Sequence, residues 1–119
     1  MTRDEMKGRT KAYANRVVKL CSALPQNWIA QTLGKQLLRS GTSVGANYRG
    51  VCRAKSNLDF IHKLRIVEEE RDESLFWMEL LVDNNFVRPS RLSDLMKEGD
   101  EILAIVVSSA KTARSARSA

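Results

Sequence analysis

Residues 33–51 have the sequence LGKQLLRSGTSVGANYRGV, and its spacing predicts a long helix that packs in a bundle. Six residues recur at intervals of four, three, four, three and four, which is the period of packed helices. They are Leu33, Leu37, Ser40, Val44, Asn47 and Val51. Asn27 precedes the pattern and suits an N-cap, so the helix is expected over about residues 27–53.

Four of the six glycines of the chain lie in this helix: Gly34, Gly41, Gly45 and Gly50. Each costs a helix about 1 kcal/mol relative to alanine. A helix that tolerates four of them is expected to let a neighbouring backbone approach closely. The alternative is a break in the helix near residues 41–43.

Three further apolar patterns have helical spacing, and no strand-like alternation competes with them. Pro25 ends the first, Ser56 begins a capping box with Asp59 for the next, and Ser90 is expected to cap the last. The expected ranges are about 10–24, 57–84 and 90–110.

The sequence therefore predicts an all-α fold, an antiparallel up-down-up-down four-helix bundle, in a single domain over residues 1–119. Residues 1–9 and 111–119 are expected to be frayed or disordered. The third pattern has an apolar seam that consists of Phe60, Leu64, Val67, Arg71, Ser74, Met78 and Leu81. An unpaired guanidinium would be costly on this seam, so a carboxylate or carbonyl partner is predicted for Arg71.

Near its end the third helix is apolar almost all the way round, over residues 75–82. A helix that is buried on one side does not have this pattern. We therefore expect a homo-oligomer in which Phe76, Trp77 and Leu80 contact another subunit.

The composition limits the location of the protein. The chain has 119 residues, and residues 1–5 lack the apolar stretch of a signal peptide. The longest nearly apolar run, residues 102–107, is too short to cross a bilayer, so a cytoplasmic protein without membrane contact is expected. Cys21 and Cys52 are interpreted as small buried hydrophobic residues rather than a disulfide or a metal site.

Positive charge is concentrated in the first half. Residues 1–56 hold 11 Lys or Arg and 2 Asp or Glu, a net charge of +9 within an overall +6. On a helical wheel, four cations of the expected second helix share two heptad phases roughly opposite the seam of Leu33 and Leu37, and a fifth extends the row. These five form what we call the basic stripe: Lys35, Arg39, Arg49, Arg53 and Lys55. It could bind the phosphates of RNA or DNA. The alternative, favoured by the lack of an interleaved aromatic residue, is a solvated face or one that meets the acidic third helix of a neighbour.

The sequence contains no motif of a known catalytic site. It has no GxGxxG or GxxxxGK[ST] phosphate loop, no GxSxG and no HExxH. The acidic run of residues 68–73 has no Glu-x-x-His pair, and His62, the only histidine, is not at helical spacing from Glu68. We therefore predict no catalytic residue, no metal site and no cofactor.

Residues 34–49, GKQLLRSGTSVGANYR, closely resemble the central helix of the 23S rRNA intervening-sequence protein family. Further similarity lies in residues 53–56, 59–64, 69–73 and 77–81, so that the resemblance covers about residues 10–110. It implies an antiparallel bundle that assembles as a ring-like homopentamer. It also implies kinship with the accessory variability protein of diversity-generating retroelements, a basic pentamer that associates with nucleic acid and a reverse transcriptase.

The family has no catalytic residues to transfer to this chain, and Gly50 stands where its members usually have an acidic residue. We therefore expect a non-enzymatic, homo-oligomeric protein that binds structured RNA or DNA through the basic stripe. The alternative is a scaffold or adaptor with a protein partner and no specific binding of nucleic acid.

Overall fold

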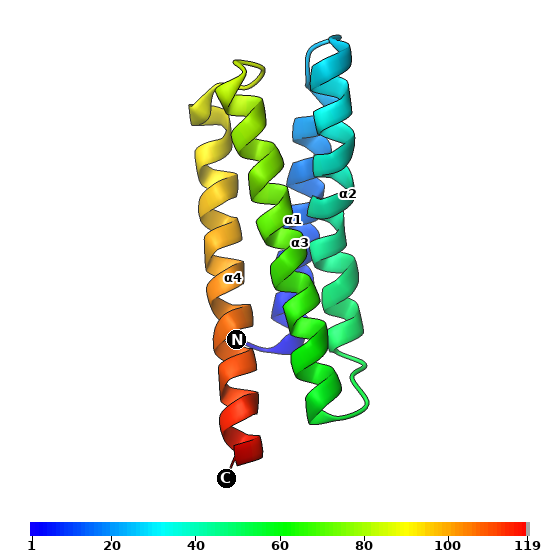
Figure 1. The fold of residues 1–119 in the computed structure, drawn as a ribbon, viewed down its shortest axis with the longest axis vertical. Helices are drawn as coiled ribbons and strands as arrows, with labels where there is room; N and C mark the ends of the chain where they lie inside the picture. The colour runs from blue at the N-terminus through cyan, green and yellow to red at the C-terminus, as the bar shows by residue number, and fades with distance from the viewer. Residues whose placement is uncertain (119) are drawn as a thin grey trace.

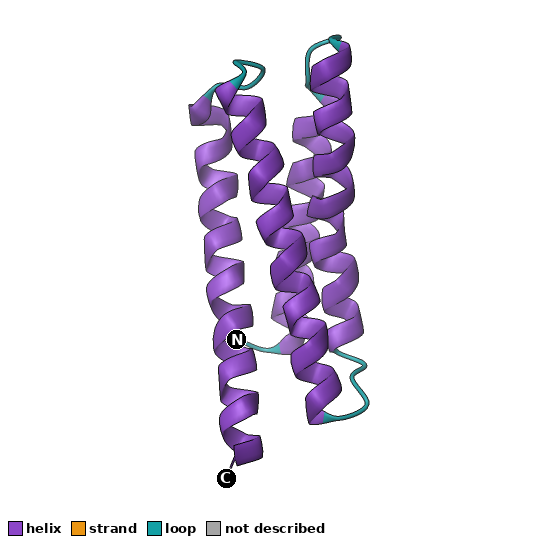
Figure 2. Ribbon diagram, in the orientation of Figure 1, coloured by secondary structure: helices purple, strands orange, loops and turns teal. Residues whose placement is uncertain are grey.

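The predicted central helix is α2, Trp28–Val51, in the computed structural model, which describes residues 1–118. It packs on α1, Arg3–Ser22, and on α3, Asn57–Asp83, while α4, Pro89–Ser118, covers the other side of α3 (Figure 1). No strand occurs among the residues that the structure describes (Figure 2). The fold is therefore the predicted all-α four-helix bundle.

The four helices alternate in direction along a body of 53 × 21 × 20 Å, with the start of α1, the end of α4 and the α2–α3 connection at the same end (Figure 1). The three connections are short, so consecutive helices pack as antiparallel neighbours. None of the described helices has the length and apolar character that crossing a membrane requires.

The predicted seam of α3 forms the centre of the core. All but its first residue are buried: Leu64, Val67, Arg71, Ser74, Met78 and Leu81. On α2 the core face is rotated slightly from the predicted seam, because Leu33 and Asn47 are only half-buried while Ala30 and Tyr48 are buried. The Asn47 amide donates to the Ser43 carbonyl of its own helix, at 2.9 Å.

The glycines of α2 bring α1 close. A Cβ on Gly41 would lie 2.8 Å from both methyl groups of the buried Val17, and one on Gly45 would lie 3.1 Å from the Thr10 carbonyl oxygen. Since α2 is continuous through residues 41–43, the alternative of a helix break is wrong. A Cβ on Gly50 would lie 4.0 Å from its nearest neighbour, the Cδ of Lys63, so close approach does not explain this glycine.

The first helix begins at Arg3, not at residue 10, and the expectation that residues 1–9 are frayed is not what the structure shows. The Thr2 hydroxyl accepts the Glu5 N–H, and the Glu5 carboxylate accepts the Thr2 N–H. These two hydrogen bonds satisfy N–H groups that the helix itself leaves without a partner. The Met6 side chain, which is 2% exposed, anchors the first turns of the helix in the core.

The fourth helix begins at Pro89, so Ser90 lies within it and is not its cap. Proline suits the first position of a helix because its missing N–H would have no partner there. The helix continues through residues 111–118, which were expected to fray. The buried Ala113 lies in this segment, and its carbonyl accepts the Asn57 amide at 2.8 Å, whereas residue 119 lies outside the described residues.

The two cysteines are free and half-buried. Both pack against the core as small hydrophobic residues, but neither is fully buried as the sequence interpretation required. Burial raises the pKa of the Cys21 thiol to about 11. This thiol is therefore protonated at neutral pH and has little nucleophilic character.

Candidate nucleic-acid interface

The fold divides the basic stripe into parts with different surroundings. Arg39 leans toward α3, where its guanidinium hydrogen-bonds to Glu73 and lies 3.6 Å from a Glu70 carboxylate oxygen. The charge of Arg39 is therefore offset within the same chain. At Arg39 the basic stripe does meet an acidic third helix, but this helix belongs to the same chain and not to a neighbouring subunit.

Arg49 and Arg53 lean the other way, toward α1. With Lys7 and Lys11 of α1 they line a groove of about 310 Å³, and these four cations define what we call the basic groove. Its other lining residues are small: Ala14, Thr42, Gly45 and Ala46. None of its lining residues is a carboxylate.

Lys35 and Lys55 lie outside the basic groove. Lys35 borders a separate, mostly apolar depression between α1 and α2, beside Val18 and Leu38. Lys55 belongs to the α2–α3 connection, where its N–H donates to the Asp59 carboxylate at 3.0 Å.

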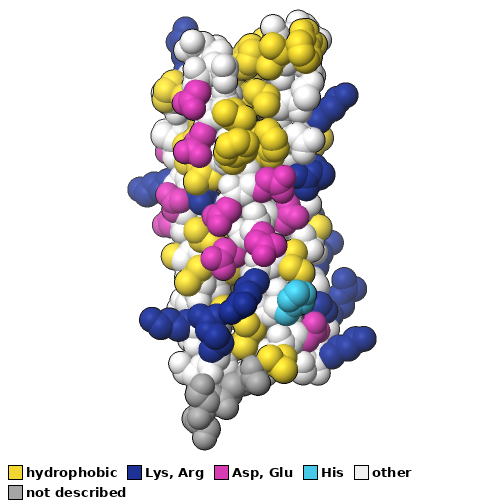
Figure 3. All heavy atoms as spheres, in the orientation of Figure 1, with side chains coloured by type: hydrophobic (Ala, Val, Ile, Leu, Met, Phe, Trp, Pro, Cys, Tyr) yellow, Lys and Arg dark blue, Asp and Glu magenta, His cyan; other side chains and the backbone are white. Residues whose placement is uncertain are grey.

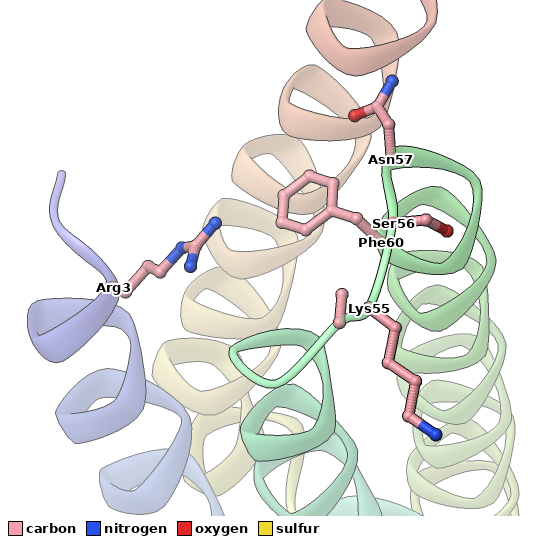
Figure 4. A pocket seen from close by; sticks show the side chains of 6 residues that line it. Arg3, Lys55, Ser56, Asn57 and Phe60 are labelled. Atoms are coloured by element: carbon pink, nitrogen blue, oxygen red, sulfur yellow. The ribbon is translucent and has the colours of Figure 1, made fainter.

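Lys55 also lines a cavity of about 320 Å³ at the end of the bundle, shown in Figure 4. The other residues of this end cavity are Arg3, Ala54, Ser56, Asn57 and Phe60. The Arg3 guanidinium carbon lies 5.6 Å from the centre of the Phe60 ring, which is the geometry of a cation–π contact. This end of the bundle thus combines cations with an aromatic ring.

Cations also gather on the neighbouring face at the same end. Figure 3 shows Lys and Arg side chains over the lower parts of α3 and α4, beneath a belt of Asp and Glu at mid-height. Arg65 and Arg114 line a shallow depression there with His62. Because the fold brings the start of α1, the end of α2, the start of α3 and the end of α4 together, this end is basic.

We call the carboxylates of residues 68–73, in the middle of α3, the acidic belt. Glu69 and Asp72 are exposed, and burial together with the neighbouring Glu73 raises the pKa of Glu70 against the opposing effect of Arg39. Between α1 and α4, the Arg9 guanidinium donates two hydrogen bonds to the Glu98 carboxylate, at 2.7 and 2.8 Å. These hydrogen bonds lower the pKa of Glu98. Arg9 is thus a cation of α1 that is already paired, by Glu98 and Glu101. Among the described residues, no group of three or more His, Cys, Asp or Glu is placed to hold a metal ion.

Apolar side chains gather over the upper part of α3 (Figure 3). Phe76 is 51% exposed and meets the half-buried Trp77 edge to face, with ring centres 5.1 Å apart. With the half-buried Leu80 they form what we call the apolar patch. Trp28, at the start of α2, is 77% exposed and not part of the core.

Sequence reasoning missed Lys7, Lys11 and the Arg3–Phe60 pair. A signal was present, because Arg3, Lys7 and Lys11 are four residues apart and therefore share one face of α1. Nothing in the sequence of α2 showed that α1 supplies the other wall of the groove. Nor could the aromatic ring be found there, because it comes from α3.

Comparison with known proteins places this geometry in context. A family model described as 23S rRNA-intervening sequence protein matches residues 5–108. A crystal structure of a protein of unknown function from the S23 ribosomal protein family of Bacteroides thetaiotaomicron is similar, with a TM-score of 0.86 and 33% sequence identity. The match covers 93% of this chain and 99% of that chain. No curated protein gives a significant match.

Proposed function

This chain belongs to the 23S rRNA-intervening sequence protein family, and from that premise we propose that it is a non-enzymatic protein that binds structured RNA or DNA. The observation that carries the proposal is the basic groove, in which Lys7, Lys11, Arg49 and Arg53 line one concave surface without a carboxylate. Phosphate groups are the natural ligands of such a surface, because their neutralisation releases counter-ions from the nucleic acid.

The orientation of the bound nucleic acid follows from the charges around the groove. The acidic belt repels phosphates, and Arg39 is engaged by Glu70 and Glu73. The basic end and the basic groove are contiguous along α1, since Arg3 and Lys7 are one helical turn apart. We therefore expect the backbone of the nucleic acid to lie along α1 and α2 toward the end of the bundle.

A titration of fluorescently labelled structured RNA at several salt concentrations tests the proposal. Four phosphate contacts predict that the logarithm of the affinity falls with the logarithm of salt with a slope of about −3 to −4. No saturable binding, or an affinity independent of salt, would remove the claim. Binding to a protein that survives nuclease treatment would then favour the scaffold alternative.

We further propose that copies of the chain assemble through the apolar patch, five of them if the family resemblance holds for assembly. Support comes from Phe76, since an aromatic side chain that is half-exposed beside a second aromatic ring is typical of a protein interface. Light scattering at micromolar concentration should give a mass several times 13.4 kDa, near five protomers.

Phe76→Ser should lower the measured mass, because it removes apolar surface from the proposed contact. Leu58→Ser is the matched control, since Leu58 is 57% exposed at the opposite end of the same helix. A wild-type mass of one protomer would contradict the proposal, as would an equal effect of the two substitutions.

A further inference from the structure

We propose that the end cavity takes one unpaired base of the bound nucleic acid, which stacks on the ring of Phe60. This inference rests on the proposed function and specifies the kind of nucleic acid that the protein prefers. It concerns a cavity at the end of the bundle, separate from the groove that binds the phosphates of a duplex.

The ring is held ready for stacking. Phe60 lies in the first turn of α3, half-buried and packed against the core, so that one part of the ring is fixed while another borders the cavity. Figure 4 shows the Arg3 side chain reaching from α1 across the cavity toward this ring. An aromatic ring that is already ordered loses little conformational freedom when a ligand stacks on it.

Arg3 occupies the position that a base would take. At 5.6 Å from the ring centre, its guanidinium leaves no space for another planar group between the two. Arg3 is exposed and lies at the start of its helix, so it can move outward without disturbing the core. In its new position it can meet the phosphate or cover the outer face of the base, as arginine does in RNA complexes.

The cations beside the cavity lead to it from the basic groove. Arg3 is one helical turn from Lys7, and Lys55 follows Arg53 by two residues. Lys55 extends from the rim of the cavity away from the ring, where it is available to a phosphate rather than to a base (Figure 4). A strand whose backbone lies in the basic groove therefore reaches Phe60 at its end.

Only an unpaired nucleotide fits this arrangement. The bases of a duplex are stacked inside the helix, whereas bases in ends, loops and bulges can stack on aromatic side chains. We therefore expect the protein to prefer a duplex with a single-stranded overhang over a blunt duplex with the same number of phosphates.

The test compares these two RNA duplexes by fluorescence anisotropy. The overhang should increase the affinity of the wild-type protein at least about fivefold, which is the lower limit of the effect of stacking one base. Phe60→Leu keeps an apolar side chain against the core but removes the ring face, so it should abolish this preference and leave the affinity for the blunt duplex unchanged. The matched control is Leu58→Ala, an exposed position in the same turn, which should keep the preference.

A second measurement does not depend on the stability of any variant. The fluorescence of 2-aminopurine in the overhang should be quenched when the wild-type protein binds, because the base stacks on Phe60. Quenching with either an RNA or a DNA overhang supports the inference. Equal affinity for blunt and overhanging duplexes, or a preference that persists in Phe60→Leu, would overturn it while leaving the proposed function intact. Failure to bind even the blunt duplex would overturn the proposed function itself.

Discussion

Replacing Asp100 by alanine should destabilise the bundle by about 2–3 kcal/mol, because it leaves a buried guanidinium without its carboxylate. Only 4% of the Arg71 side chain is exposed, and its Nη2 donates to Asp100 at 2.5 Å and to the Met96 carbonyl at 3.4 Å. The Nε of Arg71 is buried without a partner. The loss of Asp100 would thus leave Met96 as the main acceptor.

The network around Arg71 explains why the guanidinium fits in the core. Gly99 of α4 leaves space for it, since a Cβ there would lie 3.0 Å from the Arg71 Nε. The Arg71 carbonyl accepts the Ser74 hydroxyl at 2.7 Å, and that hydroxyl in turn lies 3.0 Å from the Tyr13 hydroxyl. The network around Arg71 thereby joins α1, α3 and α4. Within it, burial raises the pKa of the Tyr13 hydroxyl.

Urea denaturation measures the effect, and Asp72→Ala is the matched control. Both carboxylates reach solvent, since Asp100 is 69% and Asp72 is 62% exposed, but Asp72 lies 3.9 Å from Arg71, beyond hydrogen-bond distance. Its loss should therefore cost less than about 1 kcal/mol. Arg71→Met in the Asp100→Ala background should recover stability, because it removes the unpaired charge and keeps the core filled. Equal destabilisation by Asp100→Ala and Asp72→Ala would contradict this account.

The sequence predicted the fold where apolar spacing alone determines it. The seam of α3 from Leu64 onward and the need of Arg71 for a partner were both confirmed. The seam of α2 was predicted less well, since Leu33 and Asn47 are only half-buried. The start of α1 was placed too late, since Met6 is a single apolar residue in a charged segment. The capping box of Thr2 and Glu5 was present in the sequence and would have corrected it.

The candidate site was only partly predictable. A helical wheel showed that the cations of α2 share one side, but not that Arg39 would meet α3 while Arg49 and Arg53 would meet α1. That difference arises because α1 and α3 pack on α2 at different positions around its circumference, which the sequence of α2 does not reveal. The pairing of Phe60 with Arg3 depends on three-dimensional packing alone, because the two residues lie on different helices.

Neutralising the basic groove should have the largest effect on function. The variant Lys7→Gln, Lys11→Gln, Arg49→Gln, Arg53→Gln removes four phosphate contacts, so its affinity for structured RNA should fall by about a thousandfold or more at ~0.1 M salt. All four side chains lie at the surface, so the fold should be retained, which circular dichroism would verify.

Arg39→Gln is the matched control. Arg39 belongs to the same helix and to the same predicted stripe, but Glu70 and Glu73 of α3 already engage it. Its loss should therefore leave the affinity for RNA nearly unchanged. The groove variant removes four charges and Arg39→Gln removes one. A general effect of net charge would therefore give Arg39→Gln about a quarter of the groove variant's loss in log affinity, whereas binding in the groove gives it none.

The most direct measurement of the central claim is the salt dependence of RNA binding in the groove variant, compared with the wild-type protein and with Arg39→Gln. We predict that the slope of log affinity against log salt becomes shallower by about 3 to 4 in the groove variant and stays at the wild-type value in Arg39→Gln. A groove variant that keeps the wild-type slope would contradict the assignment of this surface to nucleic acid.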